Sequence, residues 1–261
     1  MSRRAVLVLA TALAVATAPT ALGQGETTGL TELVRTTSSS VVLLKIFDHG
    51  GRAAGTGSGF FVGEDLVATN QHVIDRAFRM VAVLEDGSEV PVDAVLAEDA
   101  EHDLALVRVQ DDARPLPLFR GQVEVGESVA VIGSPLGLAG TLSTGVVSAY
   151  RQDGLEGGAF PGPLIQISAP ISPGSSGSPV MNLDGEVIGV AVAGYSNGEN
   201  LNFAVPTSLL FTLESTIDPA GTPVRSLGQS AAKKRNVALG RNLLISLAVF
   251  TALIVILRRL R

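Results

Sequence analysis

The chain has 261 residues, a net charge of −6 and no cysteine. The length allows one or two domains, and the missing cysteine excludes disulfides, thiol catalysis and cysteine-ligated metals. The acidic balance argues against a nucleic-acid partner, which would require a basic surface.

The N-terminus has the pattern of a secretory signal. Arg3 and Arg4 precede an apolar stretch at 5–18, and small residues follow up to Gly23. A positive segment, a short apolar segment and small residues at a cleavage site are typical of a signal peptide. We predict a signal peptide over 1–23, with an uncleaved N-terminal anchor as the alternative, followed by a polar N-terminal arm over 24–37.

Short apolar runs separated by turn residues fill the middle of the chain. Asp-Gly and Asn-Gly pairs between these runs favour hairpins. The pattern predicts an all-β domain over 38–217, built as one or two barrels or as a sandwich. The predicted strands lie at 41–47, 59–62, 66–69, 80–84, 90–96, 104–109, 128–132, 145–150, 164–167, 187–193 and 202–205.

The C-terminal part is predicted to hold a helix, a linker and a membrane span. Apolar side chains share one face of a helix over 207–217, whereas 218–236 lack periodicity and are typical of a flexible linker. The apolar run 237–257 would be about 31 Å long as a helix, enough to cross a bilayer. After an exported N-terminus, this span leaves 258–261 as a cytoplasmic tail. The middle of the chain is then expected on the extracytoplasmic side, periplasmic or extracellular.

Three segments carry residues that suit nucleophilic catalysis. His72 follows a predicted strand, Asp103 precedes another, and Ser176 lies in a glycine- and serine-rich turn. A serine hydroxyl needs a base to take its proton, and histidine has a pKa near neutrality. A carboxylate fixes the imidazole tautomer and stabilises the imidazolium. We therefore predict His72, Asp103 and Ser176 as a catalytic triad, although the serine turn alone would be more typical of a plain surface turn.

The turn around an exposed Ser176 is also predicted to form an oxyanion hole. Gly174 and Gly177 permit the positive φ that a tight turn requires. The donor segment is Gly174, Ser175 and Ser176, with the N–H groups of Gly174 and Ser176 aimed at one point. The neighbouring His102 is expected to be a surface or supporting residue, because adjacent strand residues point to opposite faces.

These segments resemble the motifs of trypsin-like (chymotrypsin-fold) serine proteases of the bacterial HtrA/Deg group. The matches are T-N-Q-H-V around His72, D-L-A-L from Asp103 and G-S-S-G-S-P around Ser176. Further matches, including G-S-G-F at 57–60 and N-F-A-V-P at 202–206, extend the resemblance over 38–210. The resemblance implies two six-stranded antiparallel β-barrels with the triad between them. It also implies a serine endopeptidase that works through an acyl-enzyme.

The resemblance has departures. Family members usually carry PDZ domains, and here the predicted linker and membrane helix stand in their place. Ser168 occupies a position where many HtrA proteins have Asp, which puts their loop-activation network in doubt. The N-terminal arm lacks the aromatic residues that help HtrA proteases to trimerise, so the oligomeric state, trimer or other, stays open.

Specificity is predicted from the residues before and after the serine turn. Pro170 stands six residues before Ser176, where trypsin has an acid, so basic specificity is not expected. By resemblance, Phe203, Ala204 and Val205 would join Ile171 in lining a substrate pocket. An apolar pocket favours small or medium aliphatic side chains before the scissile bond.

The leading hypothesis is a membrane-tethered serine endopeptidase that acts on unfolded or extended proteins in envelope quality control or regulated proteolysis. A catalytically silent, protease-fold binding or chaperone module and a hydrolase of non-peptide esters are the alternatives. Asp99 is predicted to be a surface charge. Three histidines without ligand spacing predict no metal site, and no cofactor is expected.

Overall fold

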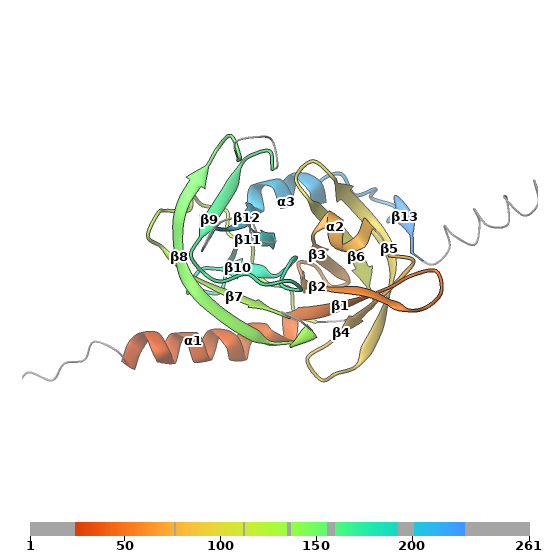
Figure 1. Ribbon diagram of the computed structural model, residues 1–261, viewed down its shortest axis with the longest axis horizontal. Helices are drawn as coiled ribbons and strands as arrows, with labels where there is room; N and C mark the ends of the chain where they lie inside the picture. The colour runs from red at the N-terminus through yellow and green to blue at the C-terminus, as the bar shows by residue number, and fades with distance from the viewer. Residues whose placement is uncertain are drawn as a thin grey trace, which may run out of the picture.

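The computed structural model describes residues 24–75, 77–111, 113–134, 137–155, 160–192 and 201–227. Within these ranges the chain forms two antiparallel β-barrels that lie side by side, with helices around them (Figure 1). This confirms the all-β prediction and the two six-stranded barrels that the resemblance implies. The helices are α1 (Gln24–Thr37), α2 (Gln71–Asp75) and α3 (Thr207–Glu214), and a 3₁₀ turn, η1, spans Ser38–Ser40.

The first barrel contains six strands and one short added strand. They are β1 (Val41–Phe47), β2 (Ala53–Phe61), β3 (Leu66–Thr69), β4 (Arg79–Val83), β5 (Glu89–Asp99), β6 (Leu104–Val109) and β13 (Arg225–Ser226). Neighbours pair in the order β13-β5-β4-β1-β2-β3-β6, and the pairing of β5 with β6 closes the barrel. In this order β3 pairs with β6. The candidate site lies where β3 ends and β6 begins.

The second barrel contains the remaining six strands. They are β7 (Ser128–Gly133), β8 (Thr141–Arg151), β9 (Leu164–Ile167), β10 (Pro179–Met181), β11 (Val187–Val192) and β12 (Asn202–Pro206), closed in the order β10-β11-β12-β9-β8-β7. The sequence predicts all of these strands except β10, because three residues that begin with proline carry no alternation. β10 starts immediately after the Ser176 turn and anchors that turn in the barrel wall.

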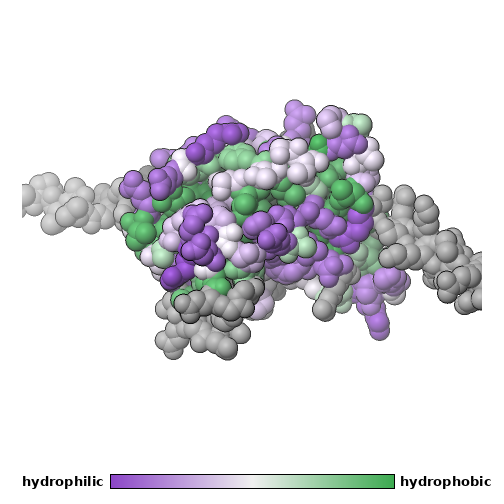
Figure 2. Space-filling model, turned by 90° about the horizontal axis from the view of Figure 1, so that it is seen from above, coloured by the Kyte–Doolittle hydropathy of each residue, from purple (hydrophilic) through white to green (hydrophobic). Residues whose placement is uncertain are grey.

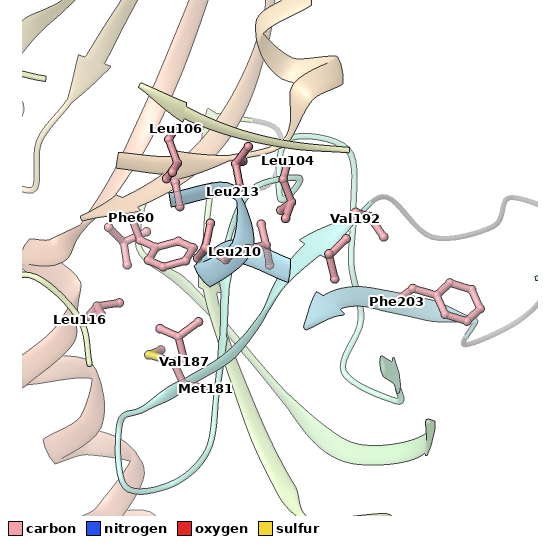
Figure 3. Packing of buried hydrophobic residues seen from close by; sticks show 14 of the residues in the cluster. Phe60, Leu104, Leu106, Leu116, Met181, Val187, Val192, Phe203, Leu210 and Leu213 are labelled. Carbon is pink, nitrogen blue, oxygen red and sulfur yellow. The ribbon is translucent and has the colours of Figure 1, made fainter. Parts of the chain in front are cut away.

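A hydrophobic cluster between the barrels fixes their relative position (Figure 3). It combines Phe60 and Leu106 of the first barrel, Val187 of the second and Leu210 of α3. Each barrel also has its own interior cluster, and Ile188, next to Val187, faces the interior of the second barrel. Truncation of the buried Leu210 to alanine would cost about 2–5 kcal/mol. The predicted closing helix therefore seals the junction on which the site depends.

The predicted N-terminal arm is helical. A Cβ at Gly185 would lie 3.3 Å from Leu33 Cδ1, so the buried Leu33 packs on the turn between β10 and β11. The last turn of α1 is closed by side chains, because Thr37 Oγ1 donates to the Leu33 carbonyl at 2.7 Å and Ser38 Oγ donates to the Val34 carbonyl at 2.7 Å. Val34 also packs against the cluster between the barrels, and the polar composition of the arm did not reveal this docking.

The first part of the predicted linker is attached to the first barrel, which corrects the expectation of a flexible stalk over 218–236. β13 pairs antiparallel with β5, with Arg225 opposite Val95. Arg225 forms an ion pair with Glu98 at 3.2 Å and donates to the Ile74 carbonyl at 3.4 Å. These contacts join distant parts of the chain, so local composition could not show them. Residues 228–236 lie outside the described residues.

The described ranges contain no helix that is long and apolar enough to cross a membrane. The predicted signal peptide at 1–23, membrane span at 237–257 and tail at 258–261 lie outside those ranges. Figure 2 shows hydrophilic side chains spread over one face of the molecule, with smaller apolar areas between them.

Candidate active site

Two neighbouring strands of the first barrel bring His72 and Asp103 together. β3 ends at Thr69, three residues before His72, and β6 begins at Leu104, directly after Asp103. The strands are antiparallel, with Thr69 opposite Ala105. The end of β3 therefore lies beside the start of β6, and two residues 31 positions apart become neighbours.

Asp103 holds His72 through two contacts. The His72 backbone N–H donates to Asp103 Oδ1 at 2.8 Å, and His72 Nδ1 lies 2.7 Å from Asp103 Oδ2. With the Nδ1 proton directed at the carboxylate, Nε2 is left as the basic nitrogen. The Asp103 side chain is 14% exposed, whereas the His72 side chain is 48% exposed. A shielded carboxylate therefore orients an imidazole that stays open to a substrate.

The backbone of Asp103 is itself held in an uncommon conformation. Its φ is +56°, and it is the one non-glycine residue with positive φ in the described part of the chain. Asn70 Nδ2 donates to the Asp103 carbonyl at 2.9 Å from a fully buried position. Asn70 is thus a further positioning residue of the T-N-Q-H-V motif, and its role is not evident from the sequence.

The turn around Ser176 is compact and largely buried. Gly174 and Gly177 have φ values of +95° and +88°, which glycine adopts without steric cost. The Ser175 N–H donates to the Ser172 carbonyl at 2.9 Å, which closes the turn before the serine. Ser176 is only 5% exposed. The expectation of a freely exposed serine is therefore wrong.

Of the three residues in the predicted donor segment, Gly174 and Ser176 keep their N–H groups free in the described part of the chain. The Ser175 N–H is already committed to the Ser172 carbonyl. The N–H groups of Gly174 and Ser176 donate to no acceptor within the described residues. Two such donors suit the oxygen of a tetrahedral intermediate, on which negative charge develops during acyl transfer.

Ser58 and Thr69 connect the Ser176 turn to the strand that leads to His72. The Ser58 N–H donates to the Ser176 carbonyl at 2.8 Å, and Thr69 Oγ1 donates to the Ser58 carbonyl at 2.7 Å. A Cβ on Gly177 would collide with the Ser58 carbonyl, so glycine is required at this approach. The serine turn of the second barrel thus meets the histidine segment of the first.

No hydrogen bond joins Ser176 Oγ to His72 in the described part of the chain. Catalytic hydrogen bonds are often long in enzymes without a bound substrate, and they tighten in the Michaelis complex.

The predicted pocket residues are divided between two hydrophobic clusters. Phe203 and Val205 belong to the cluster between the barrels, whereas Ala204 faces the interior of the second barrel. All three are at most 2% exposed, and their place in a substrate pocket stays a prediction. The alternation of strand side chains explains the division. Ile171 stays partly exposed, and its N–H donates to Asn202 Oδ1 at 3.2 Å.

A second histidine–aspartate pair stands beside the first. The His102 N–H donates to Asp99 Oδ1 at 3.1 Å, and His102 Nδ1 lies 2.7 Å from Asp99 Oδ2. Partial burial raises the pKa of Asp99, but hydrogen bonds from the His102 side chain and backbone outweigh it and hold that pKa below its ordinary 3.8. Asp99 is therefore a paired carboxylate and not a plain surface charge. His102 and Asp103 lie in a turn, so strand alternation does not separate them.

Other described features lie away from the triad. A cavity of about 440 Å³ on the second barrel is lined by residues 119–123, Tyr150 and the start of α3. Its lining contains none of the predicted catalytic or pocket residues. Within the described ranges, no group of three or more His, Asp or Glu side chains could hold a metal ion.

Two closed antiparallel barrels, a His–Asp pair on one and a serine turn on the other define a chymotrypsin-like serine protease domain. The sequence profile of the trypsin-like peptidase domain matches residues 57–190. The match covers half of the chain, so the chain belongs to the family of trypsin-like peptidase domains.

The chain is similar to HtrA-type serine proteases. It is 35% identical over 182 residues to a DegP-like protein of Rhizobium meliloti named as a periplasmic serine endoprotease, covering 67% of this chain and 35% of that protein. It is 35% identical over 194 residues to serine protease HTRA1 of Xenopus tropicalis, covering 71% and 40%. A solved structure of the HtrA-type protease AlgW with a tripeptide superposes with a TM-score of 0.66 at 26% identity, covering 74% of this chain and 64% of that one. The chain spans less than half the length of these curated relatives.

Proposed function

We propose that the protein is a membrane-anchored, extracytoplasmic serine endopeptidase of the HtrA type, acting on unfolded or extended proteins. The observation that carries the proposal is the double contact of Asp103 with His72, next to a serine turn with two free N–H donors. The same arrangement runs acyl transfer on several unrelated folds.

The chemistry follows from the roles of these groups. His72 Nε2 takes the proton of Ser176 Oγ, and the oxygen attacks the scissile carbonyl. The N–H groups of Gly174 and Ser176 stabilise the oxyanion, and the shielded Asp103 carboxylate stabilises the imidazolium. His72 then gives its proton to the leaving amine, which leaves an acyl-enzyme on Ser176. Water, activated by the same imidazole, hydrolyses this ester and restores the serine.

The placement at a membrane rests on the two ends of the sequence. The predicted signal peptide at 1–23 and the predicted span at 237–257 would put the barrels outside the cytoplasm. The periplasmic name of the DegP-like relative supports this placement. We expect the full chain to sediment with membranes and to become soluble when 237–261 are deleted. A full chain that stays soluble would refute the anchor.

Replacement of Ser176 tests the activity. We expect the wild-type protein to cleave unfolded casein and to be labelled by a fluorophosphonate. Ser176→Ala should lose both properties while it keeps its thermal unfolding transition, because the side chain is small and sits in a turn held by backbone hydrogen bonds. Casein cleavage by the purified variant at the wild-type rate would contradict the assignment.

A catalytically silent binding module is the second candidate. The missing hydrogen bond between Ser176 and His72 and the 5% exposure of Ser176 favour it. The fluorophosphonate separates the two candidates, since it needs an activated serine but no protein substrate. Absence of labelling with and without casein would favour the binding module.

A further inference from the structure

Ser58 makes a hydrogen bond with each of its polar groups at the junction of the two barrels. It lies in β2 and is fully buried. Its N–H donates to the Ser176 carbonyl at 2.8 Å and its carbonyl accepts from Thr69 Oγ1 at 2.7 Å. Its hydroxyl donates to the Gly174 carbonyl at 2.8 Å and accepts from the Ser134 N–H at 3.0 Å.

We propose that the Ser58 hydroxyl is a positioning group for the oxyanion hole. It holds the Gly174 carbonyl and so fixes the Gly174–Ser175 peptide between the two N–H donors. Ser58 does not touch the substrate, and it acts through Gly174 and Ser176. This inference rests on the proposed serine endopeptidase activity.

The Gly174–Ser175 peptide is held on both of its polar sides, and the Ser58 hydroxyl supplies the hold on the carbonyl side. The φ of Gly174 is +95°, and a glycine populates positive and negative φ with similar ease. The Gly174 carbonyl and the Ser175 N–H belong to one planar peptide group, whose N–H side donates to the Ser172 carbonyl at 2.9 Å. Within the described residues, the Ser58 hydroxyl is the group that donates to the Gly174 carbonyl. Without it, rotation about Gly174 would move its N–H away from the oxyanion.

The surroundings of Ser58 are built for a small hydroxyl. A Cβ on Gly57 would come 2.6 Å from Val73 Cγ1, and one on Gly59 would come 2.7 Å from Val67 Cγ1. The flanking glycines therefore let β2 approach its neighbours closely, which brings Ser58 to the serine turn. A Cβ on Gly133 would come 3.4 Å from Ser58 Oγ, so the second barrel also closes around this hydroxyl.

The hydroxyl also connects the two barrels chemically. The Ser58 hydroxyl donates to Gly174 in the turn that carries Ser176. It also accepts the N–H of Ser134, a residue that is 1% exposed. Removal of the hydroxyl leaves a buried donor and a carbonyl unpaired, a loss that destabilises. A catalytic effect must therefore be separated from a simple loss of stability.

The test compares Ser58→Ala with Ser40→Ala in the full-length protein. Ser40 is a matched control because it is 1% exposed and its hydroxyl donates to the Arg114 carbonyl, in the segment between β6 and β7. The probes are a fluorogenic peptide amide and a peptidyl phosphonate, whose adduct on Ser176 carries a tetrahedral, anionic oxygen. Removal of an oxyanion-hole donor costs roughly 10²–10³-fold in kcat, so loss of its support should cost less, about 10–100-fold.

We expect Ser58→Ala to lower kcat and the rate of phosphonate labelling by the same factor, with KM within twofold of wild type. Ser40→Ala should lose a similar amount of thermal stability and keep both rates within twofold. Ser58→Cys, whose thiol is a weak donor of similar shape, should recover part of the rate, and it carries the test if Ser58→Ala does not fold.

Three outcomes would overturn the inference. They are a kcat of Ser58→Ala within twofold of wild type, an equal loss in Ser40→Ala, and a change confined to KM. These results leave the proposed function standing if the wild type is labelled. A wild-type protein that neither cleaves casein nor reacts with the phosphonate overturns the proposed function and this inference together.

Discussion

The two histidine–aspartate pairs of the first barrel have the same local geometry and opposite exposure. In each pair the carboxylate accepts the backbone N–H of the histidine on one oxygen and contacts Nδ1 on the other, at 2.7 Å. In the His72 pair the imidazole is 48% exposed and the carboxylate 14%. In the His102 pair the imidazole is 21% exposed and the carboxylate 31%. The aspartate is the more shielded partner in the first pair, and the histidine in the second.

This difference shows that the pairing itself does not define a catalytic dyad. A general base must present its free nitrogen to a substrate while its partner keeps the tautomer fixed. The His72 pair meets both conditions, and Ser58 and Thr69 connect its strand to the serine turn. The His102 pair instead closes the turn that delivers Asp103 into β6, since both Asp99 contacts are local to residues 99–102.

Replacement of each carboxylate by its amide should give the largest contrast between the pairs. Asp103→Asn keeps an oxygen that can accept the backbone N–H of His72. Its amide N–H, however, would donate to Nδ1 and so favour the tautomer whose proton is on Nε2. We expect kcat to fall by roughly 10⁴-fold, as for the equivalent change in a serine protease triad. Asp99→Asn should lower kcat less than about tenfold, because it acts only on the position of the turn. Steady-state kinetics on a peptide amide measures both.

Thermal unfolding of the two amide variants provides the control. Both should keep a cooperative transition, so that the kinetic difference reports on chemistry and not on folding. Equal losses of kcat in the two variants would break the contrast and make the second pair part of the catalytic machinery.

The sequence carried enough information for most of the barrels and for the contact of His72 with Asp103. β1, β3, β6 and β9 have the predicted bounds, because apolar runs between turn residues identify them. His72 and Asp103 could be paired because each flanks a predicted strand within a recognisable motif. β13 could not be foreseen, since two residues carry no period and the strand depends on the ion pair of Arg225 with Glu98.

The contacts that organise the serine turn were also beyond the sequence. Ser58 meets Gly174 across 116 positions, and nothing in G-S-G-F indicates which carbonyl the hydroxyl will reach. The predicted pocket residues show a related limit. Phe203 and Val205 look like an apolar wall, but β12 lies between two hydrophobic clusters, so both faces of the strand are buried. The local sequence pattern identifies a buried strand, but it does not show which hydrophobic cluster each face of the strand packs against.

The smallest expected effect concerns the acid stability of the second pair. The folded-state pKa of Asp99 is lowered despite partial burial, mainly through the hydrogen bond with the His102 side chain. A carboxylate with a lowered folded pKa adds stability above its unfolded pKa, near 3.8, and loses that contribution as the pH falls through the lower folded value. Because the Asp99 side chain is 31% exposed and therefore in contact with solvent, the contribution should be near that of a surface pair, about 0.2–1 kcal/mol. The difference in Tm between wild type and Asp99→Asn should therefore be present at pH 6 and shrink below pH 3.8.

A double-mutant cycle assigns this effect to the pair, because other carboxylates titrate in the same range in both proteins. In a His102→Ala background, Asp99→Asn should change Tm by less than in the wild type, since the main group that lowers the pKa is gone. If the difference were the same in both backgrounds, the backbone N–H groups at 101 and 102 alone would stabilise the carboxylate. The His102 side chain would then add nothing to the stability of the turn, and the two pairs would share their geometry without sharing a stabilising contact. A reduced difference would instead show that the contact between His102 and Asp99 stabilises the fold, whereas the neighbouring pair orients a base.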